Sequence, residues 1–304
     1  MTDTHSRVLR LDQHPGEGSG RKGWQPRLGP VGGLLLSAPM AVLIVLFVLY
    51  PLVVLSGDAL GGEAGGSRIV RVFTDPISWR ALSTTLWNSA IVAVVTVLLS
   101  AVLAWTLHAT ERRWLKILMW VTVLVPFAMG TIIKNYSIML ILVANGPINS
   151  LLLALGLIER PLTLLYTPLA VVYGITYSLI PYATFTLYSV FSTVDLRLLT
   201  ASSVLGASRW RTLIGVVLPQ VKGGIIVATA LVFVLSIGFY VSPIVLGGLQ
   251  TPFMAVQIRQ QLFNMYDFPG AAASAVVLLA VAALALLLAI VTAGRGAFKG
   301  VMTR

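Results

Sequence analysis

Long uncharged apolar runs alternate along the chain with short segments that carry nearly all of its charge. In the hydrocarbon of a bilayer every backbone N–H and C=O must be paired within the protein, so such runs are expected to be helices. A helix needs roughly 18 apolar residues to cross, and only the run 117–133 falls just short of that length. The pattern predicts six transmembrane helices, within the runs 28–57, 81–110, 117–133, 161–194, 223–258 and 268–294.

A seventh run, 135–158, is long enough to cross but is broken near its centre by Asn145, Gly146 and Pro147. Basic residues decide its place, because Lys and Arg accumulate on the cytoplasmic side. If the run does not cross, 15 of the 21 Lys and Arg residues share one side with the chain ends and 6 lie on the other; if it crosses, the division is 10 against 11. The bias favours six spans, N and C termini in the cytoplasm, and an external segment at about 135–160.

Composition excludes a water-soluble globule, because 57% of the residues are hydrophobic and only 10% are charged. The net charge of +11 is explained by basic cytoplasmic segments beside membrane lipid, so no nucleic acid partner is expected. Residues 1–30 are rich in Gly and Arg and lack the apolar residues of a core, which predicts a disordered basic cytoplasmic tail. Residues 31–304 then form a single six-span transmembrane domain.

The cytoplasmic segment at about 195–219 lies between the fourth and fifth spans and carries several basic residues. Thr193 or Asp195 can cap a helix start, since a side-chain oxygen satisfies free N–H groups there. Two interpretations fit the helix that follows: an amphipathic helix resting on the inner leaflet, and a docking surface for another protein. Its narrow face of small and aliphatic residues contains Leu198, Ala201, Ser202, Leu205 and Ser208.

The order of small residues in this segment resembles the cytoplasmic EAA loop of binding-protein-dependent ABC importer permeases. A triplet of small residues is followed, four positions after its third member, by a glycine, and the segment closes on an aliphatic-x-Leu-Pro sequence. Thr200 stands where the family usually has Glu, so the charge contact of that Glu is not carried over. The matching residues are Thr200, Ala201, Ser202, Gly206, Val216, Leu218 and Pro219.

The resemblance extends along most of the chain to permeases of the spermidine and putrescine importer family. It rests on NGPIN at 145–149, 161–165, LGAS at 205–208, GFYVSPIVLGG at 238–248 and GAAASAV at 270–276. It implies an all-α, type I ABC importer permease-like fold and a permease subunit, in the bacterial cytoplasmic membrane, of an ATP-driven importer of a polyamine or related small organic compound.

The same resemblance implies the partners and the coupling residues. The partners are a cytoplasmic ATPase dimer that holds ATP and magnesium, a second permease subunit that is a different chain, and an extracytoplasmic solute-binding protein. The segment 195–219 is the implied coupling helix, which sits in a groove of the ATPase. Its coupling residues are Leu198, Thr200, Ala201, Ser202, Leu205, Gly206, Ala207, Ser208, Leu218 and Pro219.

The chain shows no sign of an enzyme or of a cofactor of its own. The sequence GEGSGRKG at 16–23 lacks the glycine spacing of a nucleotide-binding loop and the Ser or Thr after its Lys. Two of the three histidines, His5 and His14, lie in the tail, and His108 ends the second span. No catalytic or metal cluster is therefore predicted.

Candidate residues for a substrate pathway come from the aromatic and hydroxyl side chains of the spans. Tyr173, Tyr177, Pro181, Thr184 and Tyr188 recur every three or four residues and share one helix face. Such a stripe fits a pathway, and it equally fits ordinary packing between helices. None of the ten Asp and Glu residues lies inside the six runs, so a cationic solute would rely on Tyr faces or on carboxylates of the second subunit. Further candidates are Tyr136, Ser236 and Tyr240.

Two other classes of protein compete with a permease subunit. A self-contained secondary transporter predicts ionisable residues inside the spans and an internal repeat, and neither is evident in the sequence. A membrane structural or signalling protein predicts that the cytoplasmic segment is dispensable for ATP-driven uptake.

Overall fold

The computed structural model describes residues 38–40, 42–61, 65–248 and 251–293, and these are helices and turns without a strand among them. The predicted all-α fold is therefore confirmed. The tail predicted over residues 1–30 lies outside the described residues.

The chain divides into two compact units, residues 1–51 and 52–304. The described part of the first unit contains the π-helical η1 (Val45–Leu49) and the start of α2 (Tyr50–Leu60). The large apolar side chains between Met40 and Tyr50 are exposed, as expected of a helix that is hydrophobic all round and contacts lipid. The first candidate span reaches Leu60 and therefore contains Asp58, so the prediction that the spans hold no acidic residue is wrong at this position.

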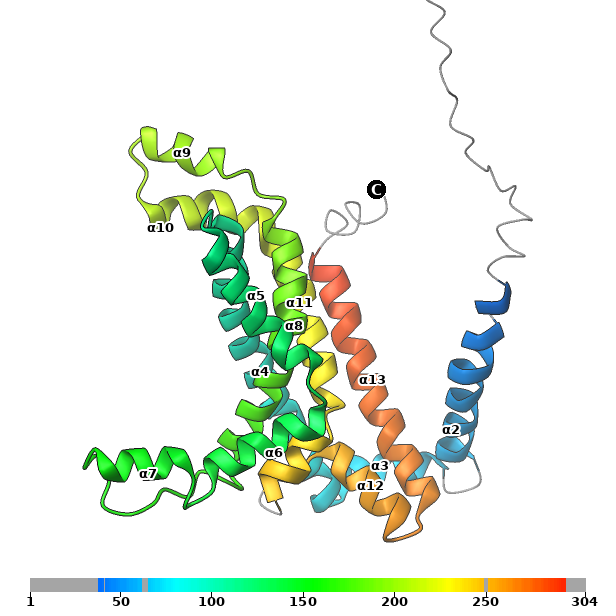
Figure 1. Cartoon of the computed structure of the whole chain (residues 1–304). Helices are drawn as coiled ribbons and strands as arrows, with labels where there is room; N and C mark the ends of the chain where they lie inside the picture. The colour runs from blue at the N-terminus through cyan, green and yellow to red at the C-terminus, as the bar shows by residue number, and fades with distance from the viewer. Residues whose placement is uncertain (1–37, 41, 62–64, 249–250, 294–304) are drawn as a thin grey trace, which may run out of the picture. The chain divides into compact units, whose positions relative to one another are not determined.

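The second unit is a helical bundle (Figure 1). Its long helices α4, α8, α11 and α13 run side by side, with α9 and α10 at one end and α3, α6 and α12 at the other. The helices are α3 (Gly65–Thr74), α4 (Pro76–Ala109), α5 (Arg113–Ala128), α6 (Thr131–Leu142), α7 (Pro147–Ala154), α8 (Pro168–Phe191), α9 (Arg197–Val204), α10 (Arg209–Thr212), η2 (Leu213–Val217), α11 (Leu218–Ile237), η3 (Pro243–Gly247), α12 (Met254–Phe263) and α13 (Phe268–Ala293).

The two central helices begin in the same way, with a capping side chain followed by proline. Asp75 accepts a hydrogen bond of 2.8 Å from the N–H of Ser78, which starts α4 and lowers the pKa of the Asp75 carboxyl below its ordinary value. Thr167 accepts one of 3.2 Å from the N–H of Ala170 and starts α8. In both helices the proline is in the first turn, where its missing N–H costs nothing.

Six segments are long and apolar enough to cross a membrane, which confirms the predicted number. Five of them overlap predicted spans, but the sixth is Thr131–Ala154 and not 117–133. The run 117–133 is divided because α5 ends at Ala128 and the extended Gly130 precedes α6. With 16 residues, α5 is shorter than a full span.

The segment Thr131–Ala154 is itself interrupted where the sequence predicts a break. A turn closed by a 2.8 Å hydrogen bond from the N–H of Gly146 to the C=O of Val143 separates α6 from α7. In Figure 1, α5 extends along α8 from the end that carries α9, whereas α7 lies across the opposite end. The predicted external segment at 135–160 overlaps the candidate span Thr131–Ala154, and its place outside the membrane stays a prediction.

The fifth span begins earlier than predicted, because Trp210–Ile237 forms one continuous helical segment. The second half of the predicted loop 195–219 therefore belongs to the span. Pro219 does not end the cytoplasmic element but stands in the first turn of α11. Proline has no N–H, and the turn before it widens into a π turn in which the N–H of Leu218 bonds the C=O of Leu213.

The NGPIN sequence fastens α7 to the extended residues that follow it. Asn149 is fully buried, and its side-chain amide exchanges two hydrogen bonds with the backbone of Leu162. The N–H of Leu162 donates to Oδ1 at 2.9 Å, and Nδ2 donates to the C=O of Leu162 at 3.0 Å. Asn149 thus joins two of the segments that carry the family resemblance.

Small residues bring the central helices together. Ala93 and Ala104 of α4, Ala183 of α8 and Ala228 of α11 are all buried in one hydrophobic cluster. Close backbone approach of this kind drives helix association in membranes through van der Waals contact. The tightest example is Gly224 of α11, where an added Cβ would overlap the side chain of Val190 on α8.

We expect Gly224→Ala to lower the unfolding temperature of the chain in detergent. The added methyl group must displace Val190, and overpacking of this kind costs about 1 to 3 kcal/mol. Gly215→Ala is the matched control, because a Cβ at Gly215 has no atom within 4 Å. Equal unfolding temperatures for the two variants would contradict the close contact.

Candidate functional site

The short helix α9 lies at one end of the bundle and is joined to α10 (Figure 1). Asp195 precedes α9, and its Oδ1 accepts a 2.9 Å hydrogen bond from the N–H of Arg197. Of the two predicted capping residues, Asp195 is therefore confirmed. The helix α9 has eight residues and is therefore shorter than the helix that the spacing from Leu198 to Ser208 predicts.

Gly206 turns the chain from α9 toward α10. Its φ of 79° lies in the left-handed region, which glycine adopts without steric cost. The N–H of Ala207 donates to the C=O of Ser202 at 3.0 Å, and the N–H of Leu205 donates to the C=O of Ala201 at 3.2 Å. The first of these bonds is that of a Schellman motif, so Gly206 ends the helix. A Cβ built on Gly206 would have no atom within 4 Å, so the space beside it is also open to a partner.

We expect uptake by Gly206→Asn to stay close to that of the unsubstituted chain, whereas Gly206→Val loses most of it. Asn tolerates positive φ better than other side chains, while a β-branched residue there is strained by about 1 to 2 kcal/mol. The measurement is the initial rate of uptake at matched amounts of chain in the membrane. A Gly206→Val variant that transports as well as the Asn variant would show that the turn is unimportant.

The predicted coupling residues in α9 and in the turn after it differ in how exposed their side chains are. Leu198, Ala201, Leu205, Gly206 and Ser208 are exposed, and Leu205 is 87% exposed.

Ser202 instead faces α10. Its hydroxyl donates to the C=O of Leu199 at 2.9 Å and shares a 2.8 Å hydrogen bond with the hydroxyl of the buried Thr212. Ala207 is half-buried. Ser202 therefore joins α9 to α10, and its role in coupling stays a prediction.

The remaining predicted coupling residues lie elsewhere or are not described. Leu218 and Pro219 are exposed in the first turn of α11. Thr200 is in α9, but its side chain lies outside the described residues.

Two apolar residues, at the end of α9 and beyond its turn, are not among the predicted coupling residues. Val204 is 82% exposed and Trp210 is 73% exposed. Val204 lies off the helix face that the spacing defined, and Trp210 follows the Gly206 turn. We name these two residues, together with the exposed Leu198 and Leu205, the apolar tip.

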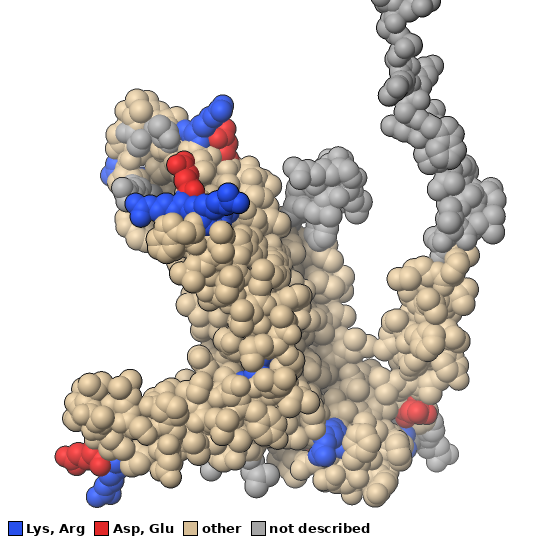
Figure 2. All heavy atoms as spheres, in the orientation of Figure 1, with Lys and Arg blue, Asp and Glu red and all other residues tan. Residues whose placement is uncertain are grey.

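Basic side chains surround the apolar tip. Figure 2 shows Lys and Arg atoms gathered over α9, α10 and the start of α5. Four of these side chains, Arg112, Arg113, Arg197 and Arg211, are exposed. The sequence analysis predicts that this end faces the cytoplasm, and this side stays a prediction.

The predicted pathway residues do not form one continuous open face. Tyr173 and Tyr177 stack with ring centroids 6.5 Å apart, and Tyr173 is 54% exposed. Farther along α8, Pro181 and Thr184 are buried. Tyr188 packs edge-on against Trp120 of α5, with centroids 5.2 Å apart. Most of the stripe therefore packs within the bundle, and Tyr173 is its exposed end.

The other pathway candidates also differ in exposure. Tyr136 is exposed, Tyr240 is half-buried, and Ser236 is fully buried. The hydroxyls of Thr184 and Ser236 have no hydrogen-bond partner among the described residues. Buried hydroxyls normally have one, so both stay candidates for contact with water or solute.

A polar cavity that the sequence did not reveal lies between α6, α8 and α11. Lys134 is only 5% exposed and belongs to its wall, although the sequence shows it merely as a lone charge between two apolar runs. The cavity has a volume of about 140 Å³ and is lined by Thr131, Lys134, Ser178, Leu179, Tyr182, Leu235 and Phe239.

Residues 109–295 match the family described as "Binding-protein-dependent transport system inner membrane component". The chain belongs to this family. The permease is 32% identical over 253 residues to the spermidine/putrescine transport system permease protein PotB of Escherichia coli (strain K12), across 80% of its own length and 91% of that relative. It is 27% identical over 256 residues to the probable sulfate transport system permease protein cysT of Nephroselmis olivacea, across 82% and 86% of the two chains.

Two solved structures share the fold of the permease. A chain of a bacterial alginate ABC transporter, in complex with alginate pentasaccharide-bound periplasmic protein, superposes with a TM-score of 0.71 at 17% identity over 85% of the permease and 92% of that chain. A chain of the MetNI methionine ABC transporter gives 0.52 at 15% identity, over 71% and 95%. The predicted type I fold and family resemblance are confirmed. The protein is a multi-pass inner-membrane permease subunit of an ABC importer, and not an enzyme.

Proposed function

We propose that this permease imports a polyamine or a related small organic compound. The carrying observation is the 32% identity to PotB over 80% of the chain. The partners follow from the same family: a second permease that is a different chain, a cytoplasmic ATPase dimer that binds ATP and magnesium, and an extracytoplasmic binding protein that delivers the solute.

Coupling to the ATPase is assigned to the apolar tip. Its exposed side chains suit insertion into a groove of a protein partner, where they would be withdrawn from water. The Ser202–Thr212 hydrogen bond of 2.8 Å holds α9 to α10, and the helical segment from Trp210 continues to Ile237. α11 packs against α4, α8 and α13. A displacement of the tip is therefore passed to the bundle through one continuous helix.

The tyrosine pair Tyr173–Tyr177 is the proposed contact for the solute's ammonium groups. A cation above an aromatic face is attracted by the ring quadrupole. Because α8 presents hydroxyl and aromatic groups instead of carboxylates, a cationic solute can pass without being held by a fixed opposite charge.

The test is uptake of radiolabelled putrescine and spermidine by bacteria that lack their own polyamine importers and express the whole transport system. We expect saturable uptake that excess spermidine competes and sulfate does not, with a higher KM for Tyr173→Ala than for Tyr173→Phe. Sulfate uptake without polyamine uptake would overturn the proposed solute class.

A further inference from the structure

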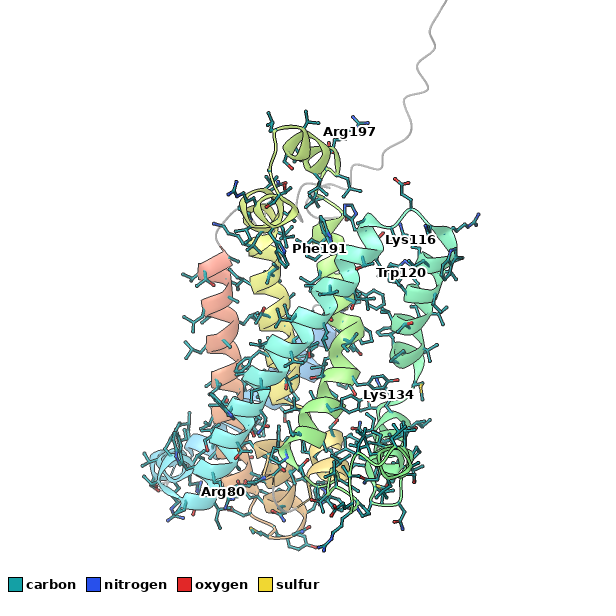
Figure 3. All side chains as sticks on the ribbon, turned by 90° about the vertical axis from the view of Figure 1, so that its left-hand side faces the viewer. Arg80, Lys116, Trp120, Lys134, Phe191 and Arg197 are labelled. Carbon is teal, nitrogen blue, oxygen red and sulfur yellow. The ribbon has the colours of Figure 1, made fainter. Side chains whose placement is uncertain are left out.

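Lys134 is a buried cation within the apolar segment Thr131–Ala154. In Figure 3 it lies between the levels of Lys116 and Arg80 along the bundle, and not at either end. Among the described residues its ammonium group has no hydrogen-bond partner, and no carboxylate oxygen lies within 4.0 Å of it. The charge is therefore uncompensated within the part of the chain that the structure describes.

The cavity around Lys134 offers a further unpaired polar atom. Ser178 is buried, and its hydroxyl has no partner among the described residues. Tyr182 also lines the cavity. An ionisable residue at membrane depth normally faces protein or a wet cavity and pairs with an opposite charge. A cation beside an unpaired hydroxyl is suited to hold an anion.

The anion could belong to the transported solute or to a carboxylate of a neighbouring subunit, and the distribution of acidic residues bears on this choice. Within the described candidate spans, Asp58 is the only Asp or Glu, and it lies in the last turns of α2. A solute anion would compensate Lys134 only while solute is bound, and a polyamine carries no anionic group. A carboxylate fixed on a neighbouring subunit compensates the charge in every state of the transport cycle.

The rim of the cavity is suited to contact with another subunit. Tyr182 and Leu235 are exposed at its edge, and Phe127 packs against Tyr182 with ring centroids 5.5 Å apart. Apolar and aromatic surface around a charged depression matches the usual composition of an interface. The same rim would exclude water from an ion pair inside.

We propose that the second permease subunit places an Asp or Glu carboxylate in this cavity and forms an ion pair with Lys134. The hydroxyl of Ser178 donates a hydrogen bond to the same carboxylate. This inference rests on the proposed pairing with a second permease. It names Lys134 as the residue of this chain that determines which permease can pair with it.

The experiment measures how much second permease is recovered with the tagged chain after extraction in mild detergent. Lys134→Glu should lower this recovery at least about tenfold, because it places two like charges in a buried site. Lys134→Arg should retain it, and Arg160→Glu, a charge reversal at an exposed position, should have no effect. Each Asp or Glu in the spans of the second permease is then changed to Lys in the Lys134→Glu background, and one of these changes should restore recovery and uptake.

The outcomes separate the ion pair from the pairing itself. If the unsubstituted chain recovers no second permease, both the pairing and the ion pair fail. If it recovers the second permease and Lys134→Glu does so equally well, only the ion pair is overturned. Normal recovery with a raised KM for the solute would assign Lys134 to solute contact instead. Failure of every charge reversal in the second permease to restore a lost assembly would also refute the ion pair.

Discussion

Leu205→Asp is expected to abolish ATP-dependent uptake while the chain remains folded in the membrane at its normal level. Leu205 is 87% exposed, so the substitution removes almost no internal packing. In a groove of the ATPase, however, the new carboxylate would be buried without a partner, which costs several kcal/mol. The measurement is the uptake rate together with the amount of ATPase that co-purifies, and both should fall to background.

Two control variants accompany this prediction. Leu205→Met keeps the apolar volume and should transport normally. Ser192→Asp adds the same charge at the exposed end of α8, outside the apolar tip, and should leave the ATPase bound. If Leu205→Asp retains the ATPase and transports at the normal rate, the apolar tip is not the coupling surface.

Asn149→Ala should lower the unfolding temperature more than any other single substitution in the segment 135–160. The truncation removes the fully buried amide of Asn149 and with it the side-chain partners of the N–H and C=O of Leu162. The loss of both hydrogen bonds costs about 2 to 4 kcal/mol, which corresponds to a decrease of roughly 5 to 15 °C. Thermal unfolding in detergent measures it.

The adjacent Ser150→Ala is the matched control, because Ser150 is exposed on the same helix. Its unfolding temperature should stay within about 2 °C of that of the unsubstituted chain. An Asn149→Ala variant as stable as this control would show that the contact with Leu162 does not hold α7 in place.

The number of spans was predictable from the sequence. Uncharged apolar runs indicate segments inside the membrane, and the basic residues between them indicate segments in water. The positions at which the helices are interrupted were harder to predict from the sequence. Pro147 signals its break through its missing N–H, and α7 starts there. Gly130 also separates two helices, but glycine is common inside transmembrane helices and gave no such signal.

The short helix of the segment 195–219 was predictable from its spacing, but the orientation of its side chains was not. A helical period identifies residues on one face, yet it does not say which face the next helix covers. Ser202 points to Thr212 of α10 because the Gly206 turn folds the two helices together. Val204 and Trp210 are exposed on either side of that turn. These positions depend on the turn, which a period within one helix cannot describe.

The burial of Lys134 was even less predictable from the sequence. In the sequence it separates two apolar runs and therefore has the character of a membrane-edge residue. In the structure the packing of α6 against α8 encloses it beside Ser178. Burial of this residue depends on a helix that lies more than thirty positions farther along the chain, so no local pattern reports it.

The central claim is that the chain is the membrane subunit of an ATP-driven importer, coupled through the apolar tip. Proteoliposomes that contain the purified permease pair and ATPase, supplied with the binding protein and labelled putrescine, test it most directly. The predicted result is uptake that requires ATP and binding protein and disappears with Leu205→Asp. Accumulation of putrescine by this chain alone, without ATP, would contradict the claim.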